Sequence, residues 1–372
     1  MKKHAQFHGS DLEEIEKVYQ IPKEEIVCFG ANVNPLGLSE KVKSKLAKHL
    51  DIITTYPDRN YSSLRQTIGT YCTIDSDYIV VGNGSTELIS LFIQHRSPKH
   101  ALILGPTYSE YERELTLCGG TFSYYNLMAE EDFQLNIQDF CQHLTGTVDL
   151  LILCNPNNPT SSAISTTDLE TIIRTCQKSD IFVMIDETYV EFVPELDKVS
   201  AVSLVPKYNN LMVLRGVSKF FAAPGLRLGY GMTSNQHFLS ILKEHQNPWS
   251  LNSVGAFAGE LFLQDTDYIQ KTRKLIETER TRMYQCLQEI PQLHVFKPSA
   301  NFLLVQILKD GITSFDVFDA LIQQKLMVRD CSSFQSLNGE FIRFCIMNPE
   351  DNTKLLQAFY QFFKTVPSEN LN

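Results

Sequence analysis

Five short apolar runs, each ending in small or polar residues, constrain the fold of this chain more than any other feature. They are YIVVGNGS (78–85), ALILGPTYS (101–109), DLLILCNPNNPT (149–160), IFVMIDETY (181–189) and LMVLRGVSK (211–219). Strands that are apolar along their whole length are buried on both faces, and helical patterns between them supply the cover. The sequence therefore predicts an α/β fold with a mainly parallel sheet flanked by helices.

One of the intervening helical patterns is TTDLETIIRTCQKS (166–179). Leu169, Ile172 and Ile173 share one face at helical spacing, and Thr167 is the expected N-cap. The chemically unusual residues of the chain follow directly after the apolar runs. Because ligands of open α/β sheets bind outside the carboxyl ends of the strands, this register predicts a binding crevice at that edge.

The pattern changes after about residue 246. A long helical pattern at 267–290 is followed by strands at 301–308 and 341–347 and by helices near 314–325 and 351–364. This succession is typical of a second, smaller α+β domain. We expect an N-terminal arm (1–40) that contributes to the small domain and the substrate site, a large domain (41–245) and a small domain (246–372).

Composition excludes several classes of function. The net charge of −10 argues against non-specific binding of nucleic acid or anionic membranes, so positive charge for an anionic ligand must be local. No apolar run reaches the roughly 18 residues of a membrane helix, and the first residues turn acidic, which predicts a cytoplasmic protein. The nine cysteines include no C-x-x-C pair, so neither a zinc site nor a disulfide framework is expected, and we predict no metal.

The stretch GVSKFFAAPGLRLGYG (216–231) places Lys219 among small residues. A lysine amine attacks carbonyl groups when desolvation or neighbouring cations lower its pKa, although a lone lysine at a strand end is more often a surface residue. Asp186 ends the run IFVMID, so its carboxylate is expected at the floor of the crevice, where it needs a cationic or donor partner. A helix cap or a structural ion pair is the plain alternative, and a protonated ring nitrogen is the functional one.

The segment VGNGSTELI predicts a strand, a tight turn and a helix start. Gly84, Ser85 and Thr86 would present free amides and hydroxyls to a phosphate, with Arg227 adding charge. Ser or Thr followed by Glu is also an ordinary helix start.

Three further polar or aromatic side chains follow strands: Tyr108, Asn158 and Tyr189. Tyr108 is suited to stack on a flat ring, while Asn158 and Tyr189 offer hydrogen-bond donors; their plain alternatives are a core aromatic and an Asx-Pro turn. Taken with Lys219 and Asp186, they describe a socket for pyridoxal 5′-phosphate, which is held by a lysine Schiff base and an acidic partner of its pyridine nitrogen.

On these motifs the chain resembles the fold-type I enzymes of the class I and II aminotransferase superfamily over essentially its whole length. The resemblance implies that Lys219 forms the Schiff base, that Asp186 pairs with the ring nitrogen and that Tyr189 is part of the catalytic set. It further implies that Asn158 and Tyr189 contact the ring 3′ oxygen, that Tyr108 stacks on the ring, and that the phosphate is bound by Gly84, Ser85, Thr86, Ser218 and Arg227. Tyr56, in TTYPDRNY, matches a tyrosine that reaches the neighbouring subunit's cofactor, which implies a homodimer.

Within the superfamily, three stretches resemble threonine-phosphate decarboxylases: FHGSDLEEI (7–15), CFGANVNPLG (28–37) and MVRDCSSFQSLNGEFIRF (327–344). This resemblance implies a phosphorylated amino acid bound by His8, Gly9, Asn32, Asn158, Arg329 and Arg343, with Arg343 on the carboxylate. We therefore expect decarboxylation of L-threonine O-3-phosphate, an activity of cobalamin biosynthesis; the alternative is an aminotransferase of histidinol-phosphate type. Gly216, Ser161 and Ser10 depart from the residues common in relatives.

A pyridoxal-phosphate fold that serves as a transcriptional sensor is the remaining alternative. Such a protein needs a DNA-binding module with a basic recognition helix before the socket. Only about 30 residues precede the loop at 28–37 here, and they include the acidic SDLEEIE. The sequence therefore favours an enzyme.

Overall fold

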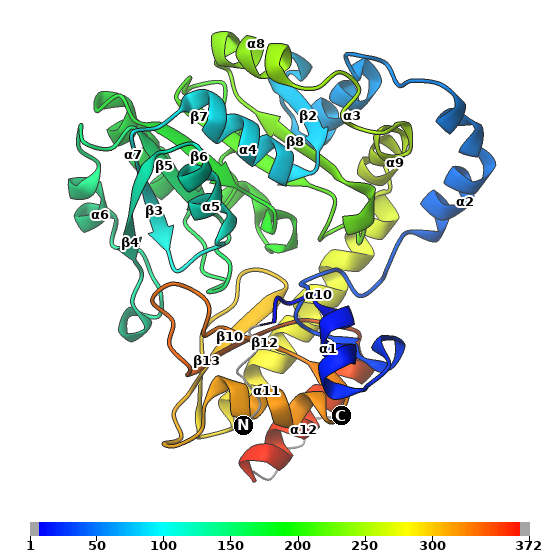
Figure 1. Cartoon of the computed structure of the whole chain (residues 1–372), viewed down its shortest axis with the longest axis vertical. Coiled ribbons are helices and arrows are strands. Elements are labelled where there is room, and N and C mark those ends of the chain that lie inside the picture. Colours follow the sequence, from blue (N-terminus) through cyan, green and yellow to red (C-terminus); the bar gives the residue numbers. More distant parts are fainter. Residues whose placement is uncertain (1–6, 365–372) are drawn as a thin grey trace.

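The computed structural model describes residues 7–364 and is built around a seven-stranded sheet in the upper part of Figure 1. In spatial order its strands are β2 (Ile79–Asn83), β8 (Leu228–Met232), β7 (Leu211–Gly216), β6 (Phe182–Asp186), β5 (Leu150–Cys154), β3 (His100–Gly105) and β4 (Thr121–Asn126). The pairs from β7 to β4 are parallel, whereas β8 runs antiparallel to both of its neighbours. The predicted mainly parallel sheet is confirmed.

Helices cover both faces of this large sheet. One face carries α4 (Ser85–Arg96), α5 (Glu110–Leu117) and α8 (Gln236–His245); the other carries α3 (Ser62–Cys72), α7 (Thr166–Lys178) and α9 (Ser253–Leu263). Successive side chains of a strand point to opposite faces, so Leu150 and Ile152 join the first apolar layer while Leu151 and Leu153 join the second. The sheet is therefore buried on both sides, as its apolar runs require.

The start of α7 differs from the expectation. Ser165, with extended backbone, accepts a hydrogen bond at 3.1 Å from the amide of Asp168 through its hydroxyl, whereas Thr167 lies inside the helix. Ser165 therefore takes the N-cap role that we assigned to Thr167, since only a residue outside the helix can turn its side chain back onto the free amides. The apolar face predicted for this helix is fully buried.

A second, four-stranded antiparallel sheet lies in the lower part of Figure 1. Its order is β12 (Arg329–Asp330), β13 (Phe341–Cys345), β10 (Phe302–Ile307) and β9 (Leu293–Val295), and its helices are α10 (Thr266–Gln288), α11 (Ser314–Ile322) and α12 (Pro349–Phe363). The strands and helices predicted after residue 246 are thus present. The short strands β1 (Val27–Cys28) and β11 (Leu326–Met327) pair in parallel and attach the N-terminal segment beside this sheet.

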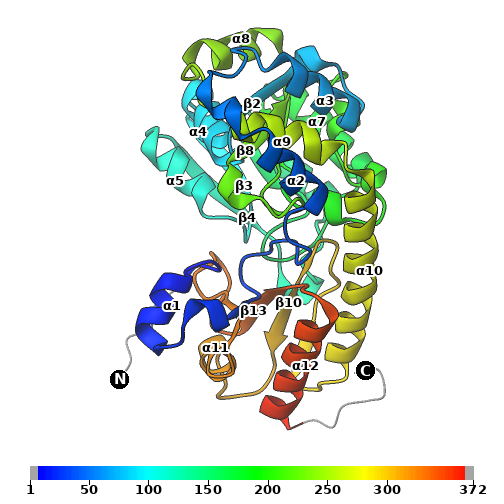
Figure 2. The same cartoon turned by 90° about the vertical axis from the view of Figure 1, so that its right-hand side faces the viewer.

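Helix α10 runs alongside both sheets and joins the upper and lower parts of the molecule (Figure 2). Helix α2 (Glu40–Lys48) packs with α9 next to the large sheet, while α1 (Leu12–Tyr19) lies near the small sheet. The domain limits at residues 40 and 245 stay a prediction.

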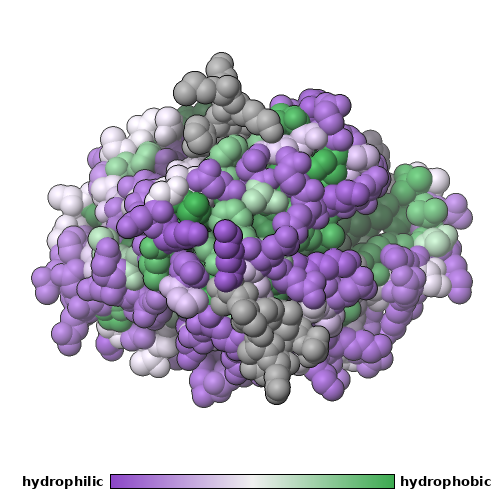
Figure 3. Space-filling model, turned by 90° about the horizontal axis from the view of Figure 1, so that it is seen from below, coloured by the Kyte–Doolittle hydropathy of each residue, from purple (hydrophilic) through white to green (hydrophobic). Residues whose placement is uncertain are grey.

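The surface seen from below is mostly hydrophilic (Figure 3). Hydrophobic side chains gather at its right-hand edge, the side on which α2 lies in Figure 1. Among residues 7–364, no helix combines the length and the apolar content needed to cross a bilayer.

Candidate active site

A cavity of about 590 Å³ lies at the carboxyl ends of the parallel strands and reaches the small sheet. It brings together most of the residues that the sequence singled out: His8, Gly9, Ser85, Thr86, Tyr108, Asn158, Asp186, Tyr189, Ser218, Lys219, Arg227, Arg329 and Arg343. Gly84 and Asn32 lie just behind this lining and contact it through Arg227 and Tyr189. Tyr56 does not line the cavity of this chain.

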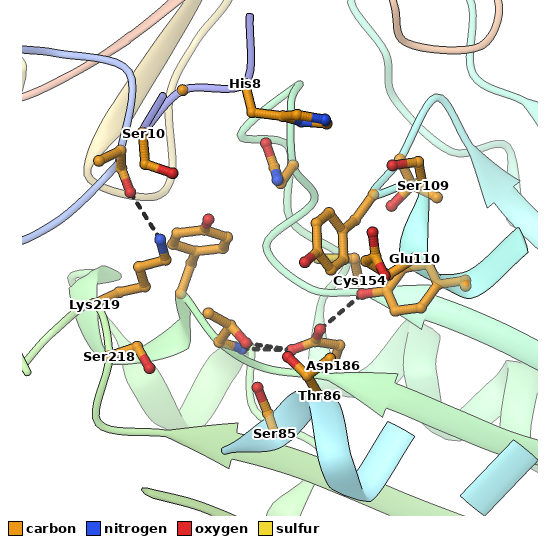
Figure 4. A pocket seen from close by; sticks show the side chains of 18 of the residues that line it. His8, Ser10, Ser85, Thr86, Ser109, Glu110, Cys154, Asp186, Ser218 and Lys219 are labelled. Atoms are coloured by element: carbon orange, nitrogen blue, oxygen red, sulfur yellow. Dashed lines mark hydrogen bonds between the residues drawn. The ribbon is translucent and has the colours of Figure 1, made fainter. Parts of the chain in front are cut away.

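Lys219 follows β7 and points into the cavity (Figure 4). Its Nζ donates to the carbonyl oxygen of Ala31 at 2.8 Å, and no carboxylate among the described residues accepts from it. Burial, and after it the positive charge of Arg343, lowers the pKa of this amine to about 8. At neutral pH about a tenth of such an amine is unprotonated, far more than for an exposed lysine, and the unprotonated form is the one that attacks carbonyl groups.

Asp186 is the last residue of β6 and is almost fully buried. Its Oδ2 accepts from the Tyr111 hydroxyl at 2.7 Å, and its Oδ1 accepts from the amide and hydroxyl of Thr188 at 2.9 and 2.6 Å (Figure 4). All three donors are neutral. A buried carboxylate held only by neutral donors keeps its charge available for a cationic ligand.

Arg343, on β13, reaches from the small sheet toward residues of the large one. Its Nη1 donates to the side-chain oxygen of Asn158, its Nη2 donates to the Gly30 carbonyl at 2.6 Å, and the guanidinium lies over the Phe302 ring at 5.6 Å. Its Nε is buried without a partner among residues 7–364. Buried donors are normally satisfied, so this atom marks a place for a ligand.

Tyr189 and Asn32 form a second contact between the two parts of the pocket. The Asn32 side-chain nitrogen donates to the Tyr189 hydroxyl at 3.4 Å, a long hydrogen bond. Asn32 has a left-handed backbone (φ 55°), and its side-chain oxygen is buried with no partner among the described residues. Burial raises the pKa of the Tyr189 phenol, so the hydroxyl stays protonated and able to donate.

The start of helix α4 forms a cradle for an anion. Gly84 precedes the helix with φ 86°, and a Cβ added to it would lie 2.4 Å from Arg227 Nη2, so only glycine lets the guanidinium lie against this turn. Within residues 7–364 no side chain caps the N-terminus of α4, and Ser85 and Thr86 line the cavity there. Free helix amides next to an arginine are the chemistry of a phosphate site.

Arg329, on β12, is the second buried arginine of the small sheet. Its Nη2 donates to Ser333 Oγ at 2.6 Å, and its guanidinium lies 5.6 Å from the centre of the Phe334 ring. Burial lowers its pKa, which reflects the cost of keeping this charge out of water. Arg329 and Arg343 occupy opposite positions of the β12–β13 pair, so the two cations are neighbours.

His8 and Gly9 reach the pocket because the N-terminal segment passes close to the loop after β1. A Cβ on Gly9 would lie 2.1 Å from the Gly30 carbonyl oxygen, and one on Gly30 would lie 2.6 Å from the Gly9 oxygen. The His8 amide donates to Asp11 Oδ2 at 2.6 Å, which fixes the turn into α1. Two glycines are therefore needed for this segment to line the cavity.

Tyr56 stands apart from the other predicted residues. It is 79% exposed and its ring lies 4.8 Å from that of Trp249. Within a single chain it contacts nothing in the pocket, so its predicted role depends on a second subunit.

Three residues of the site were missed by the sequence analysis: Tyr111, Thr188 and Ser333. Thr188 had a local signal, because a threonine two residues after an aspartate often donates back to that carboxylate. Ser333 likewise follows Arg329 within the stretch at 327–344. Tyr111 had none, since its contact with Asp186 depends on how α5 packs on the sheet.

Residues 24–359 match the family model of aminotransferase class I and II. The chain is 33% identical to threonine-phosphate decarboxylase of Salmonella typhimurium, over 94% of this chain and 95% of that protein. It is 31% identical to histidinol-phosphate aminotransferase of Methanococcus aeolicus, over 94% of this chain and 93% of that one. Its fold superimposes on the crystal structure of histidinol-phosphate aminotransferase from Clostridium acetobutylicum with a TM-score of 0.85, 31% identity and coverage of 90% and 98%.

Proposed function

Since this chain belongs to the aminotransferase class I and II family, we propose that it is a pyridoxal-phosphate enzyme that decarboxylates L-threonine O-3-phosphate or a similar phospho-amino acid. Membership of this family identifies the cofactor as pyridoxal 5′-phosphate. The cradle at Gly84 and Arg227 suits its phosphate, and the buried carboxylate of Asp186 suits its ring nitrogen. The residues of the pocket therefore fit the group.

In this proposal each cofactor contact has a residue in place. Lys219 Nζ would hold the aldehyde carbon, Asp186 the ring nitrogen, and Asn158 and Tyr189 the ring 3′ oxygen. Tyr108 would pack against the ring, while Gly84, Ser85, Thr86, Ser218 and Arg227 would hold the phosphate. When bound, the cofactor would withdraw electrons from one of the bonds to the substrate Cα.

The bond to Cα that breaks is selected by the orientation in which the protein binds the substrate. Arg343 binds the carboxylate, and Arg329, His8, Gly9 and Asn32 bind the distal phosphate, so that binding energy far from Cα sets the rotation about it. Lys219 Nζ, once the substrate amine has taken its place on the cofactor, would be the acid that gives Cα a proton after carbon dioxide has left.

The observation that carries this assignment is the pair of buried arginines on β12 and β13. Among residues 7–364 their hydrogen bonds go only to neutral oxygens, those of Ser333, Asn158 and Gly30. Asp330 and Asp11 lie near enough to Arg329 to raise its pKa, but neither accepts a hydrogen bond from it among the described residues. Adjacent buried cations without a hydrogen-bonded carboxylate are costly, and a doubly anionic ligand reduces that cost. A substrate that carries both a carboxylate and a phosphate meets this requirement.

The test is to incubate the cofactor-loaded enzyme with L-threonine O-3-phosphate, with and without 2-oxoglutarate. We expect carbon dioxide and the corresponding amino-alcohol phosphate in equal amounts, without any need for the oxo acid. Turnover that begins only when the oxo acid is added would contradict the proposal.

That second outcome would instead support an aminotransferase of histidinol-phosphate type. The 31% identity to the Clostridium acetobutylicum structure, over nearly all of that chain, favours this alternative. In an aminotransferase the same arginines would bind a phosphorylated amine and then a dicarboxylic oxo acid. Histidinol phosphate with 2-oxoglutarate is therefore the matched substrate pair, and glutamate is the product to measure.

We further propose a homodimer in which Tyr56 reaches the cofactor phosphate of the partner. Leu50, Ile53 and Tyr56 are exposed apolar side chains of one short segment, and the Tyr56 ring lies 4.8 Å from that of the exposed Trp249. Exposed apolar side chains that lie close together are typical of an interface. Sedimentation equilibrium should give twice the chain mass. In a mixed dimer of Tyr56→Phe and Lys219→Ala chains, the pocket that keeps Lys219 receives an intact Tyr56 from the other chain. Mixing the two variants should therefore recover part of the cofactor affinity that Tyr56→Phe alone loses.

Two other expectations are kept as proposals. The first is a cytoplasmic location. The second is the division into an arm (1–40), a large domain (41–245) and a small domain (246–372), which limited proteolysis can test through cleavage near residues 40 and 245.

A further inference from the structure

The hydrogen bond between Tyr111 and Asp186 joins helix α5 to the floor of the pocket. Tyr111 is fully buried in the apolar layer between α5 and the large sheet, and its hydroxyl lies 2.7 Å from Asp186 Oδ2. Thr188 holds the other oxygen from the loop after β6. The carboxylate is thus fixed from two separate elements of the fold.

Four weak acids lie close enough to Asp186 for its charge to affect their pKa: Tyr108, Tyr111, Tyr189 and Cys154. The cations Lys219 and Arg227 line the same cavity. Burial first, and to a smaller extent the charge of Asp186, raises the pKa of each of the four acids. Tyr111 therefore remains protonated over the working pH range and donates throughout it. Asp186 forms no salt bridge within the described chain, and its hydrogen-bond donors are all neutral.

The Tyr111 ring has a second contact. It meets the ring of Tyr108 edge to face, with centroids 5.7 Å apart and planes at 87°. One side chain therefore touches both the residue proposed to pair with the cofactor nitrogen and the residue proposed to stack on the ring. The ring and the hydroxyl of Tyr111 can be tested apart, because phenylalanine keeps the ring and loses only the hydroxyl.

We propose that Tyr111 is a positioning residue that acts through Asp186: its hydroxyl fixes the carboxylate so that a free lone pair faces the cofactor ring nitrogen. The proposal rests on the role of Asp186 in the proposed function but not on the choice between decarboxylation and transamination. Without the hydroxyl, Oδ2 is left buried with one donor fewer and attracts the ring proton more strongly. The ring then carries less positive charge, and the nitrogen that joins Lys219 to the cofactor holds its proton more tightly.

Tyr111→Phe tests this with two measurements that need no substrate. We expect the dissociation constant of pyridoxal phosphate from the apoprotein to rise by up to about tenfold, because a carboxylate that Tyr111 no longer holds must be immobilised when the ring nitrogen binds to it. We expect the pH midpoint of the cofactor's visible absorbance change to move up by about one unit. Tyr125→Phe is the matched control, because it removes a tyrosine-to-aspartate hydrogen bond of 2.6 Å to Asp139 at the surface, and both values should stay unchanged.

The decisive experiment combines Tyr111→Phe with Asp186→Asn. If Tyr111 acts through the carboxylate, adding Tyr111→Phe to Asp186→Asn changes neither value further. An equal loss in both backgrounds would mean that Tyr111 only packs, and would overturn the proposal. If Asp186→Asn alone leaves affinity and absorbance intact, the role of Asp186 fails and the proposal falls with it.

Discussion

The two halves of the pocket differ in how far the protein itself satisfies their polar groups. In the half built on the large sheet, which we call the cofactor half, Asp186 has three donors and Lys219 has the Ala31 carbonyl. In the half built on β12, β13 and the N-terminal segment, the substrate half, Arg329 and Arg343 are buried cations held only by neutral oxygens. The cofactor half is therefore preorganised for a tightly held cofactor. The substrate half keeps two buried guanidinium groups with no hydrogen-bonded carboxylate among residues 7–364, which favours an anionic ligand.

Lys219→Ala should have the largest effect, because it removes the covalent anchor of the cofactor half. We expect loss of the visible absorbance of the bound cofactor and a fall in turnover of about 10³-fold or more. Borohydride reduction followed by peptide mapping should label Lys219 in the wild type. Lys207→Ala, which removes an exposed lysine paired with Glu170, should change nothing.

Arg329→Ala should come next and should affect only the substrate half. A lost hydrogen bond to a charged group costs about 1.5–3 kcal/mol, so KM for a phosphorylated substrate should rise roughly 10- to 150-fold. Cofactor affinity and activity on an unphosphorylated analogue should change little. Equal losses for both substrates would indicate that Arg329 is structural.

Arg343→Gln should show that the two halves are electrostatically coupled. Below a pKa of about 8 Lys219 is mostly protonated, so the rate of covalent cofactor attachment to apoprotein should rise about tenfold per pH unit up to pH 8 and then level off. Since the charge of Arg343 helps to lower that pKa, its removal should shift the midpoint to higher pH. Stopped-flow absorbance measures both profiles, and an unchanged midpoint would contradict the coupling.

The same pKa makes apoprotein stability depend on pH. The folded pKa of Lys219 lies below the unfolded value, so between about pH 8 and 10.5 the unfolded chain binds more protons than the folded one. The contribution of Lys219 to the free energy of unfolding should therefore increase with pH across this window. Urea unfolding of wild type and Lys219→Met, compared at both ends of the window, isolates this contribution.

Ser161→Gly should have the smallest effect. Ser161 has φ 60°, and its Oγ accepts from the amides of Ser299 and Ala300 at 3.1 and 2.9 Å, which ties the loop after β5 to the segment before β10. Glycine relieves the left-handed backbone but leaves the Ala300 amide without its acceptor, whereas the Ser299 amide keeps its 2.9 Å hydrogen bond to the backbone carbonyl of residue 161. The free energy of unfolding should therefore fall by only about 1 kcal/mol. Ser162→Gly is the neighbouring control in chemical denaturation.

The sequence predicted the large sheet and the cofactor half well, because apolar strands and the residues that follow them are local signals. Lys219 and Asp186 lie in one cavity for this reason. It did not predict that β8 is antiparallel, nor that Tyr111 supports Asp186, because both depend on which elements pack side by side. The sequence also placed the N-cap of α7 at Thr167, two residues after the observed Ser165. Serine and threonine are both common N-caps, so the residue type alone could not distinguish Ser165 from the two threonines that follow it.

The contact of Gly9 with Gly30 limits how the N-terminal segment can be redesigned. The backbones of Gly9 and Gly30 touch there and leave no space for a side chain at either position, although the two residues are far apart in sequence. Segments 7–11 and 28–32 therefore pack as one unit: either can be exchanged with that of a relative only if glycine is kept at both positions 9 and 30. A library that varies only the N-terminal segment would mostly sample chains that have lost His8 from the pocket rather than chains with a new substrate.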